Sequence, residues 1–119
     1  MNDLKQLLEQ YGVDHGKTME RFMGDEALYV KLLGLTLADE SLARLGGALS
    51  ANDPQAAFEA AHTLKGVAAN MGLTPYYERI CAILEPLRRN EKRDDYPALY
   101  QALEAEFKRV QELYKKLRV

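Results

Sequence analysis

The residues of this sequence best suited to chemistry are His62, Lys65 and Gly66, which lie within five positions of one another. A neutral imidazole is a nucleophile that titrates near neutral pH. In a helix, residues three and four positions apart share a face, so Lys65 and Gly66 would both adjoin His62. The lysine could pair with the negative charge of a transferred phosphoryl group, and the glycine would leave the approach to the imidazole open. The spacing therefore indicates a surface nucleophile able to carry a phosphoryl group.

The helix expected to hold these residues runs from Pro54 to Met71. Projected at about 100° per residue, its core face lies roughly opposite His62 and comprises Ala57, Ala60, Ala61, Leu64, Val67, Ala68 and Met71. The outward side carries the remaining residues of interest, which are Phe58, His62, Lys65, Gly66 and Ala69. Outward helix faces normally carry Glu, Lys, Gln and Arg, and a glycine inside a helix costs around 1 kcal/mol. The outward side of this helix departs from both preferences without an evident gain in stability, so we expect it to have a function.

The sequence around His62 also limits the chemistry. It holds no carboxylate cluster, glycine-rich phosphate loop or second ligand that could bind Mg²⁺ or ATP. The site could therefore carry a phosphoryl group but not activate one, and the metal and the acceptor would come from a partner. Phe58 and Ala69 would supply an apolar rim for a docked surface.

Other candidate residues are better explained without chemistry. His15 is expected to be a turn residue, too distant in sequence from His62 to share a metal site. Cys81 is interpreted as a small core hydrophobe, and one ring of Tyr76 and Tyr77 is expected to be buried and the other to lie at the rim. Acidic residues interleave with the one basic run, which is expected to be a solvated turn: Arg88, Arg89, Lys92 and Arg93.

Apolar residues recur at helical spacing along nearly the whole chain, which predicts an all-α protein. Two short helices are expected first, from Asn2 to about Tyr11 and from His15 to Met23, each followed by a glycine that ends it. The second of them is expected to bury Met19, Phe22 and Met23.

Asp25 is a suitable N-cap for a long third helix. Leucines seven residues apart define its expected seam: Leu28, Leu35, Leu42 and Leu49, with Leu32 and Leu45 between them. Such a repeat suits a helix nearly parallel to its neighbours in a bundle. Gly34, Gly46 and Gly47 are interpreted as close-packing positions inside this helix; the alternative is a helix that ends near Gly46.

Two more helices follow the helix that holds His62. One begins at Thr74 and is expected to bury Tyr77, Ile80, Cys81, Leu84 and Leu87; the last begins between Asp94 and Pro97. The sequence thus predicts an antiparallel up-down-up-down four-helix bundle with the two short N-terminal helices as a lid, forming a single domain over residues 1–119.

Composition narrows the setting of this domain. The chain has 119 residues, 47% of them hydrophobic, and a formal net charge of −2, so nothing directs it toward nucleic acid or a lipid surface. A single cysteine fits a reducing compartment. No signal peptide and no apolar run of about 18 residues is found, which predicts a cytoplasmic protein that does not enter a membrane.

A family resemblance is carried by the run Ala61-His62-Thr63-Leu64-Lys65-Gly66 and its continuation to Gly72. This run resembles the signature of histidine-containing phosphotransfer (HPt) domains of two-component phosphorelays, and the resemblance covers essentially the whole chain. It implies a four-helix bundle whose phospho-acceptor is His62, with Lys65 and Gly66 as its companions. Val67 stands where many members have serine or another small polar residue.

The resemblance also implies partners. His62 would exchange a phosphoryl group with aspartates of receiver domains, in response regulators or in a hybrid sensor histidine kinase, with Mg²⁺ bound by the receiver and no cofactor or kinase activity on this chain. A monomer that stands alone is expected, the alternative being one module of a hybrid kinase. Two other functions are alternatives: an adaptor that docks receivers without accepting phosphate, and a metal-binding bundle, which the apolar seams disfavour.

Overall fold

The computed structural model describes residues 3–118 of the chain, and within them it contains helices and turns and no strand. In chain order the helices are α1 (Leu4–Tyr11), α2 (His15–Arg21), α3 (Glu26–Ala38), α4 (Ser41–Ser50), α5 (Pro54–Asn70), α6 (Thr74–Arg88) and α7 (Tyr96–Leu117). Asp3 caps α1 by accepting from the amide of Lys5, and the predicted start at Asn2 lies outside the described residues.

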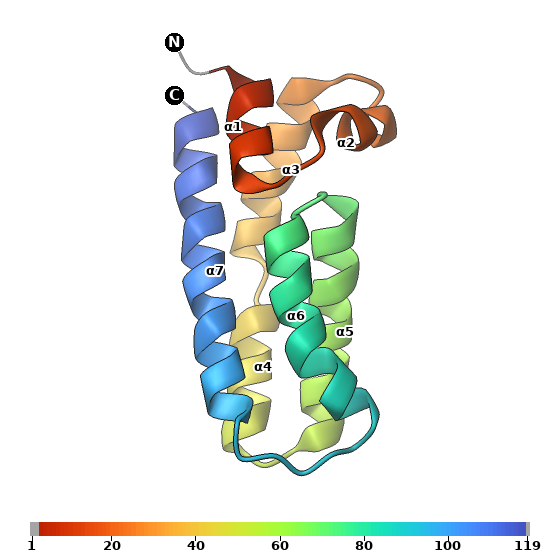
Figure 1. The fold of residues 1–119 in the computed structure, drawn as a ribbon, viewed down its shortest axis with the longest axis vertical. Helices are drawn as coiled ribbons and strands as arrows, with labels where there is room; N and C mark the ends of the chain where they lie inside the picture. The colour runs from red at the N-terminus through yellow and green to blue at the C-terminus, as the bar shows by residue number, and fades with distance from the viewer. Residues whose placement is uncertain (1–2, 119) are drawn as a thin grey trace.

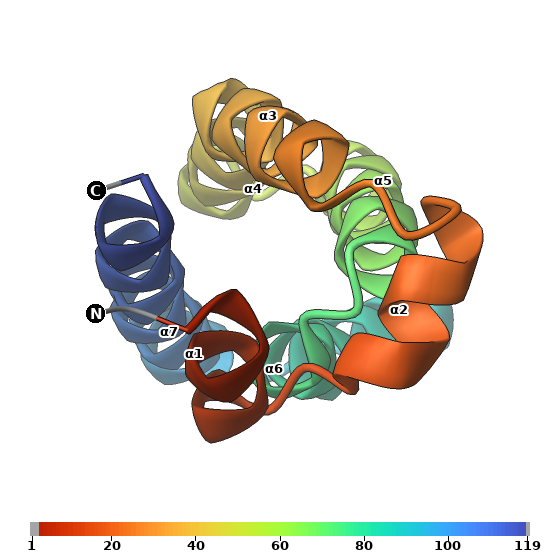
Figure 2. The ribbon, with the colours of Figure 1, turned by 90° about the horizontal axis from the view of Figure 1, so that it is seen from above.

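The four helices α4 to α7 form the bundle (Figure 1). Helix α5 packs between α4 and α6, α6 packs against α7, and α7 returns to contact α4. Helix α3 lies above α4 and contacts α7, while α1 and α2 cover the same end of the bundle (Figure 2). The predicted all-α bundle is thereby confirmed. No helix in the described part of the chain is both long and apolar enough to cross a membrane.

The long helix predicted after Asp25 is interrupted, and that prediction was wrong. Helix α3 ends at Ala38, Asp39 is extended with φ −68° and ψ 141°, and α4 begins at Ser41. The Asp39 carboxylate accepts a hydrogen bond of 2.8 Å from the Ser41 amide. A side chain that bonds its own neighbouring backbone competes with the helical ladder. The alternative end near Gly46 was also wrong, because α4 continues to Ser50.

The interruption changes which leucines are buried. Leu42 and Leu45 face the core as predicted, but Leu28 is 39% and Leu35 59% exposed. Tyr29 and Leu33 are the buried residues of α3 instead. The break lets α3 take its own rotation about the helix axis, so the seven-residue repeat does not continue across it.

A smaller correction concerns the second helix. Helix α2 ends at Arg21, before the predicted Met23, and Phe22 follows it as the C-cap. Met23 has φ 53° and is 92% exposed, so the expectation that it is buried was wrong. Met19 and Phe22 are buried as predicted.

Two of the three glycines interpreted as close-packing positions do have that role. A Cβ on Gly34 would lie 2.6 Å from the Tyr114 hydroxyl, and one on Gly46 would lie 2.5 Å from the Tyr100 hydroxyl. Both tyrosines belong to α7, so these glycines let α3 and α4 approach that helix. A Cβ on Gly47 would meet nothing within 4 Å, so close packing does not explain this glycine.

Candidate functional site

Helix α5 is held firmly at the N-terminal end that leads to His62. The Asp53 side chain accepts from the Ala56 amide and Pro54 occupies the first turn, which is a favourable start for a helix. The inner face of α5 is built from small side chains and one leucine, buried to at least 92%: Ala57, Ala60, Ala61, Leu64 and Ala68. Small residues bring α5 close to α4 and α6, and this packing fixes its rotation.

That rotation places the predicted outward residues at the surface. His62, Gly66 and Ala69 are exposed, and Phe58 and Lys65 are half-buried. A Cβ built on Gly66 would have no neighbouring atom within 4 Å. No packing contact therefore requires a glycine here, and the space beside His62 is open.

Two aromatic contacts lie on the N-terminal side of the imidazole. The rings of Phe58 and His62 are 5.8 Å apart between centroids and tilted by 31°. Arg88, at the end of α6, places its guanidinium carbon 5.5 Å from the Phe58 ring centroid. Arg88 also pairs with Glu85 at 3.4 Å. Phe58 thus lies between the histidine and a cation of the next helix.

The C-terminal side of the site is also completed by α6. The Lys65 ammonium nitrogen lies 6.0 Å from the centroid of the Tyr77 ring, within the range of a cation–π contact. Tyr77 is half-buried and its neighbour Tyr76 is 2% exposed. One ring is thus buried and the other lies at the rim, as predicted, but the buried ring is Tyr76 and not Tyr77, which the sequence analysis expected to be buried.

Tyr77 and Arg88 were missed as members of the site by the sequence analysis. They stand eleven residues apart, a spacing that puts both on one face of α6. The antiparallel pairing of α5 and α6 then brings them to the two ends of the His62 surface. The 11-residue spacing was a usable signal, but only once α6 was known to lie beside this face of α5.

Helix α2 closes the end of α5. The Arg21 guanidinium donates to the carbonyl oxygens of Ala69 at 2.7 Å and Asn70 at 3.2 Å. The last carbonyls of a helix have no partner within it, and a cation there is favourable. Ala69 therefore belongs to an ordered part of the surface.

The structure also places the residues to which no chemical role was assigned. His15 contacts Glu26 at 3.0 Å, which links α2 to the start of α3. Cys81 is half-buried rather than a core residue, which corrects the prediction, because it lies at the edge of the α6 face that also bears Tyr77. Among residues 3–118, no group of three or more His, Cys, Asp or Glu could hold a metal ion.

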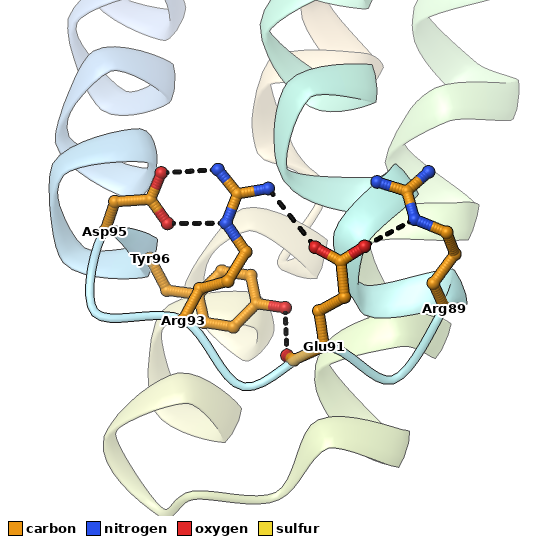
Figure 3. A network of polar contacts seen from close by, with 5 residues as sticks. All are labelled: Arg89, Glu91, Arg93, Asp95 and Tyr96. Carbon is orange, nitrogen blue, oxygen red and sulfur yellow. Dashed lines mark hydrogen bonds and ion pairs between the residues drawn. The ribbon is translucent and has the colours of Figure 1, made fainter.

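Arg88 is the last residue of α6, and the rest of the basic run lies in the turn between α6 and α7, where acidic residues bind Arg89 and Arg93 (Figure 3). Arg89 and Arg93 both contact Glu91, and Arg93 also binds Asp95 through two nitrogens at 2.9 and 2.6 Å. The Tyr96 hydroxyl donates to the Glu91 carbonyl oxygen at 2.7 Å. The Arg89 hydrogen bond lowers the pKa of the Glu91 carboxyl. These contacts order the turn.

Fold and site together define a helical bundle that displays a histidine, a lysine and an unobstructed glycine on one helix. Residues 35–113 match the Hpt domain family. The crystal structure of histidine-containing phosphotransfer protein B (HptB) from Pseudomonas aeruginosa PAO1 is 32% identical, with a TM-score of 0.78 over 90% of this chain and 96% of that one. A search of curated proteins found no match.

This chain belongs to the Hpt domain family, so the resemblance predicted from its sequence is confirmed. It is a histidine phosphotransfer domain, a phosphoryl carrier of a phosphorelay, and Hpt domains interact with receiver domains.

Proposed function

We propose that His62 accepts a phosphoryl group from the aspartate of one receiver domain and passes it to the aspartate of another. The observation that carries this proposal is the exposed imidazole beside Gly66, where a Cβ would find no neighbour within 4 Å. A docked receiver must bring its aspartyl phosphate to the histidine nitrogen, and this gap admits it. Receivers of response regulators or of a hybrid sensor histidine kinase are the proposed partners.

The proposed step is a displacement at phosphorus. A neutral ring nitrogen of His62 supplies the electron pair for the new P–N bond, the P–O bond to aspartate breaks, and the aspartate leaves as a carboxylate. Mg²⁺ on the receiver would stabilise the charge that develops. Lys65, three residues on, would pair with the oxygens of the bound phosphoryl group. The reverse displacement delivers the group to the next receiver.

Docking would use the surface around the histidine. Phe58 presents a half-buried ring beside His62, and Ala69 a small exposed side chain two turns further on. Apolar contacts ringed by polar groups are typical of protein-binding surfaces. We propose that one monomer binds one receiver at a time through this surface.

The test is phosphoryl transfer from a labelled phosphorylated receiver with Mg²⁺. His62→Gln is expected to keep the helical circular dichroism of the wild type and to accept no label. His15→Gln is the matched control, because the ring nitrogen of His15 binds Glu26 of α3, outside the proposed site, so this variant should be labelled normally at His62. Equal labelling of His62→Gln and wild type would refute the assignment. Receiver binding without any phosphohistidine would support the adaptor instead.

Lys65→Ala provides a second test of the site. Lys65 is half-buried on the surface, so its removal should leave the fold intact. Loss of its charge should slow transfer to His62 and shorten the lifetime of the phosphohistidine. The initial rate and the decay of the label would measure both effects, and unchanged values would remove Lys65 from the proposed site.

A further inference from the structure

We propose that Tyr77 of α6 is a positioning residue for phosphoryl transfer, whose ring holds the Lys65 ammonium beside His62 before a receiver docks. This inference rests on the proposed function of His62. It adds a residue from a second helix to a site otherwise assigned to α5.

The first argument is the set of contacts that Lys65 makes. Its ammonium nitrogen lies 6.0 Å from the Tyr77 ring centroid. None of the ion pairs among residues 3–118 involves Lys65. The ring is thus the group that orients this ammonium in the described part of the chain.

The second argument is that Tyr77 is itself well held. Its side chain packs against the hydrophobic core, and its amide donates to the Leu73 carbonyl oxygen at 2.8 Å in the first turn of α6. Next to it, Tyr76 is fully inside the protein, which fixes the rotation of that turn. A tyrosine ring has few rotatable bonds, whereas a lysine has four, so the ring can restrict the lysine.

The third argument is chemical. A carboxylate partner would neutralise Lys65 and repel the negatively charged phosphoryl group. An aromatic face attracts the ammonium without adding a charge. The N–H donors of Lys65 therefore stay available for phosphoryl oxygens, and ordering the side chain in advance lowers the entropy lost during the reaction.

The experiment compares Tyr77→Leu and Tyr77→Phe for the rate of transfer from a phosphorylated receiver and for phosphohistidine lifetime. Loss of the ring should lower the rate by about two- to five-fold, the factor expected from one exposed cation–π contact. Phenylalanine keeps the ring face and should restore the wild-type rate. Tyr114→Leu is the matched control, because it removes another half-buried tyrosine under a cation, Arg118 at 5.3 Å, on α7.

A double-mutant cycle separates positioning from a general structural role. In the Lys65→Ala background, Tyr77→Leu should cause no further loss, because Tyr77 acts through Lys65. A loss of equal size in both backgrounds would refute the proposal. A faster rate in Tyr77→Leu would also refute it, since the ring would then be withholding the lysine.

A spectroscopic readout addresses the contact without any phosphoryl transfer. The Hε protons of Lys65 should show an upfield ring-current shift in the NMR spectrum of wild type and Tyr77→Phe, and lose it in Tyr77→Leu. Absence of this shift in the wild type would refute the role of Tyr77 but leave the proposed function of His62 standing. A wild-type chain that no phosphorylated receiver can label would overturn the function of His62 and this inference together.

Discussion

Gly66 and Gly46 both lie inside helices, yet the space around them differs. The Cβ position of Gly66 is open, whereas that of Gly46 is 2.5 Å from the Tyr100 hydroxyl. The intrinsic preference of a helix for alanine is the same at both positions. The surroundings of each glycine therefore decide whether its replacement by alanine raises or lowers the free energy of unfolding.

Gly66→Ala is expected to raise the free energy of unfolding by up to about 1 kcal/mol and to slow transfer to His62. The added methyl finds no clash in the protein but occupies the gap through which, in the proposed transfer, a receiver would reach His62. Urea unfolding and the initial rate of labelling measure the two effects. Gly47→Ala is the control: its Cβ position is equally open, so it should stabilise without slowing transfer. Equal transfer rates in Gly66→Ala and wild type would show that the gap is not needed.

Gly46→Ala is expected to lower the free energy of unfolding. The Tyr100 hydroxyl that must move donates a 2.9 Å hydrogen bond to the Leu42 carbonyl oxygen. Overpacking costs about 1–3 kcal/mol, which exceeds the gain from helix propensity. Urea unfolding of both variants should show Gly46→Ala less stable and Gly47→Ala more stable than the wild type. A stabilised Gly46→Ala would contradict the expectation.

At the scale of a residue, the local pattern was informative for the site. His62, Lys65, Gly66 and Ala69 share the outward side because helical spacing depends on neighbouring residues alone. Tyr77 was not predicted as part of the site, since its relation to Lys65 depends on how two helices pack. The half-buried position of Cys81 has the same origin.

At the scale of a helix, the junction between α3 and α4 depends on one side chain. Their joint is made by Asp39, whose side chain bonds the Ser41 amide in place of a continuous helix. The side-chain and backbone hydrogen bonds from Ser41 lower the pKa of the Asp39 carboxyl. The ionised form therefore stabilises the joint.

Asp39→Ala is expected to reduce the free energy of unfolding by about 1 kcal/mol at pH 7. Because the folded pKa lies below the unfolded one, the stabilisation by Asp39 is present above the unfolded pKa and is lost as pH falls through the folded pKa. The difference between wild type and variant should thus shrink below about pH 4. Urea unfolding across pH measures it. Asp39→Asn keeps an acceptor and should retain most of the stability that Asp39→Ala loses. A stability difference between wild type and Asp39→Ala that does not change with pH would contradict the assignment.

The whole molecule depends on contacts between distant parts of the chain, and the clearest joins α1 to α7. The Tyr11 hydroxyl donates to Glu106 at 2.8 Å, and Glu106, which is 5% exposed, also pairs with Arg109 at 3.1 Å. Burial, followed by the hydrogen bond and charge of Glu106, raises the pKa of Tyr11. Tyr11 therefore remains a protonated donor at neutral pH.

Tyr11→Phe is expected to cost about 1–3 kcal/mol, because it leaves a buried carboxylate without one of its donors. The loss of stability should be greatest in α1, because this contact joins α1 to α7 of the bundle. Hydrogen exchange of the α1 amides should accelerate more than that of α5, and urea unfolding gives the total. Glu106→Gln, which keeps an acceptor for Tyr11, should cost less; uniform acceleration across the chain would contradict a local role.

The sequence by itself determined that the chain is helical, where α5 begins, and which face of α5 displays His62 with Lys65 and Gly66. These follow from interactions between residues a few positions apart, which any helix of this sequence would contain. The break after Ala38 also has a local cause, the Asp39 hydrogen bond to the Ser41 amide, which the sequence analysis missed. The tertiary structure alone decided that Leu28 and Leu35 face outward and that Tyr77 and Arg88 of α6 flank the site. Each of these depends on which side chains of another helix occupy the neighbouring space, and the pattern within one helix carries no information about that.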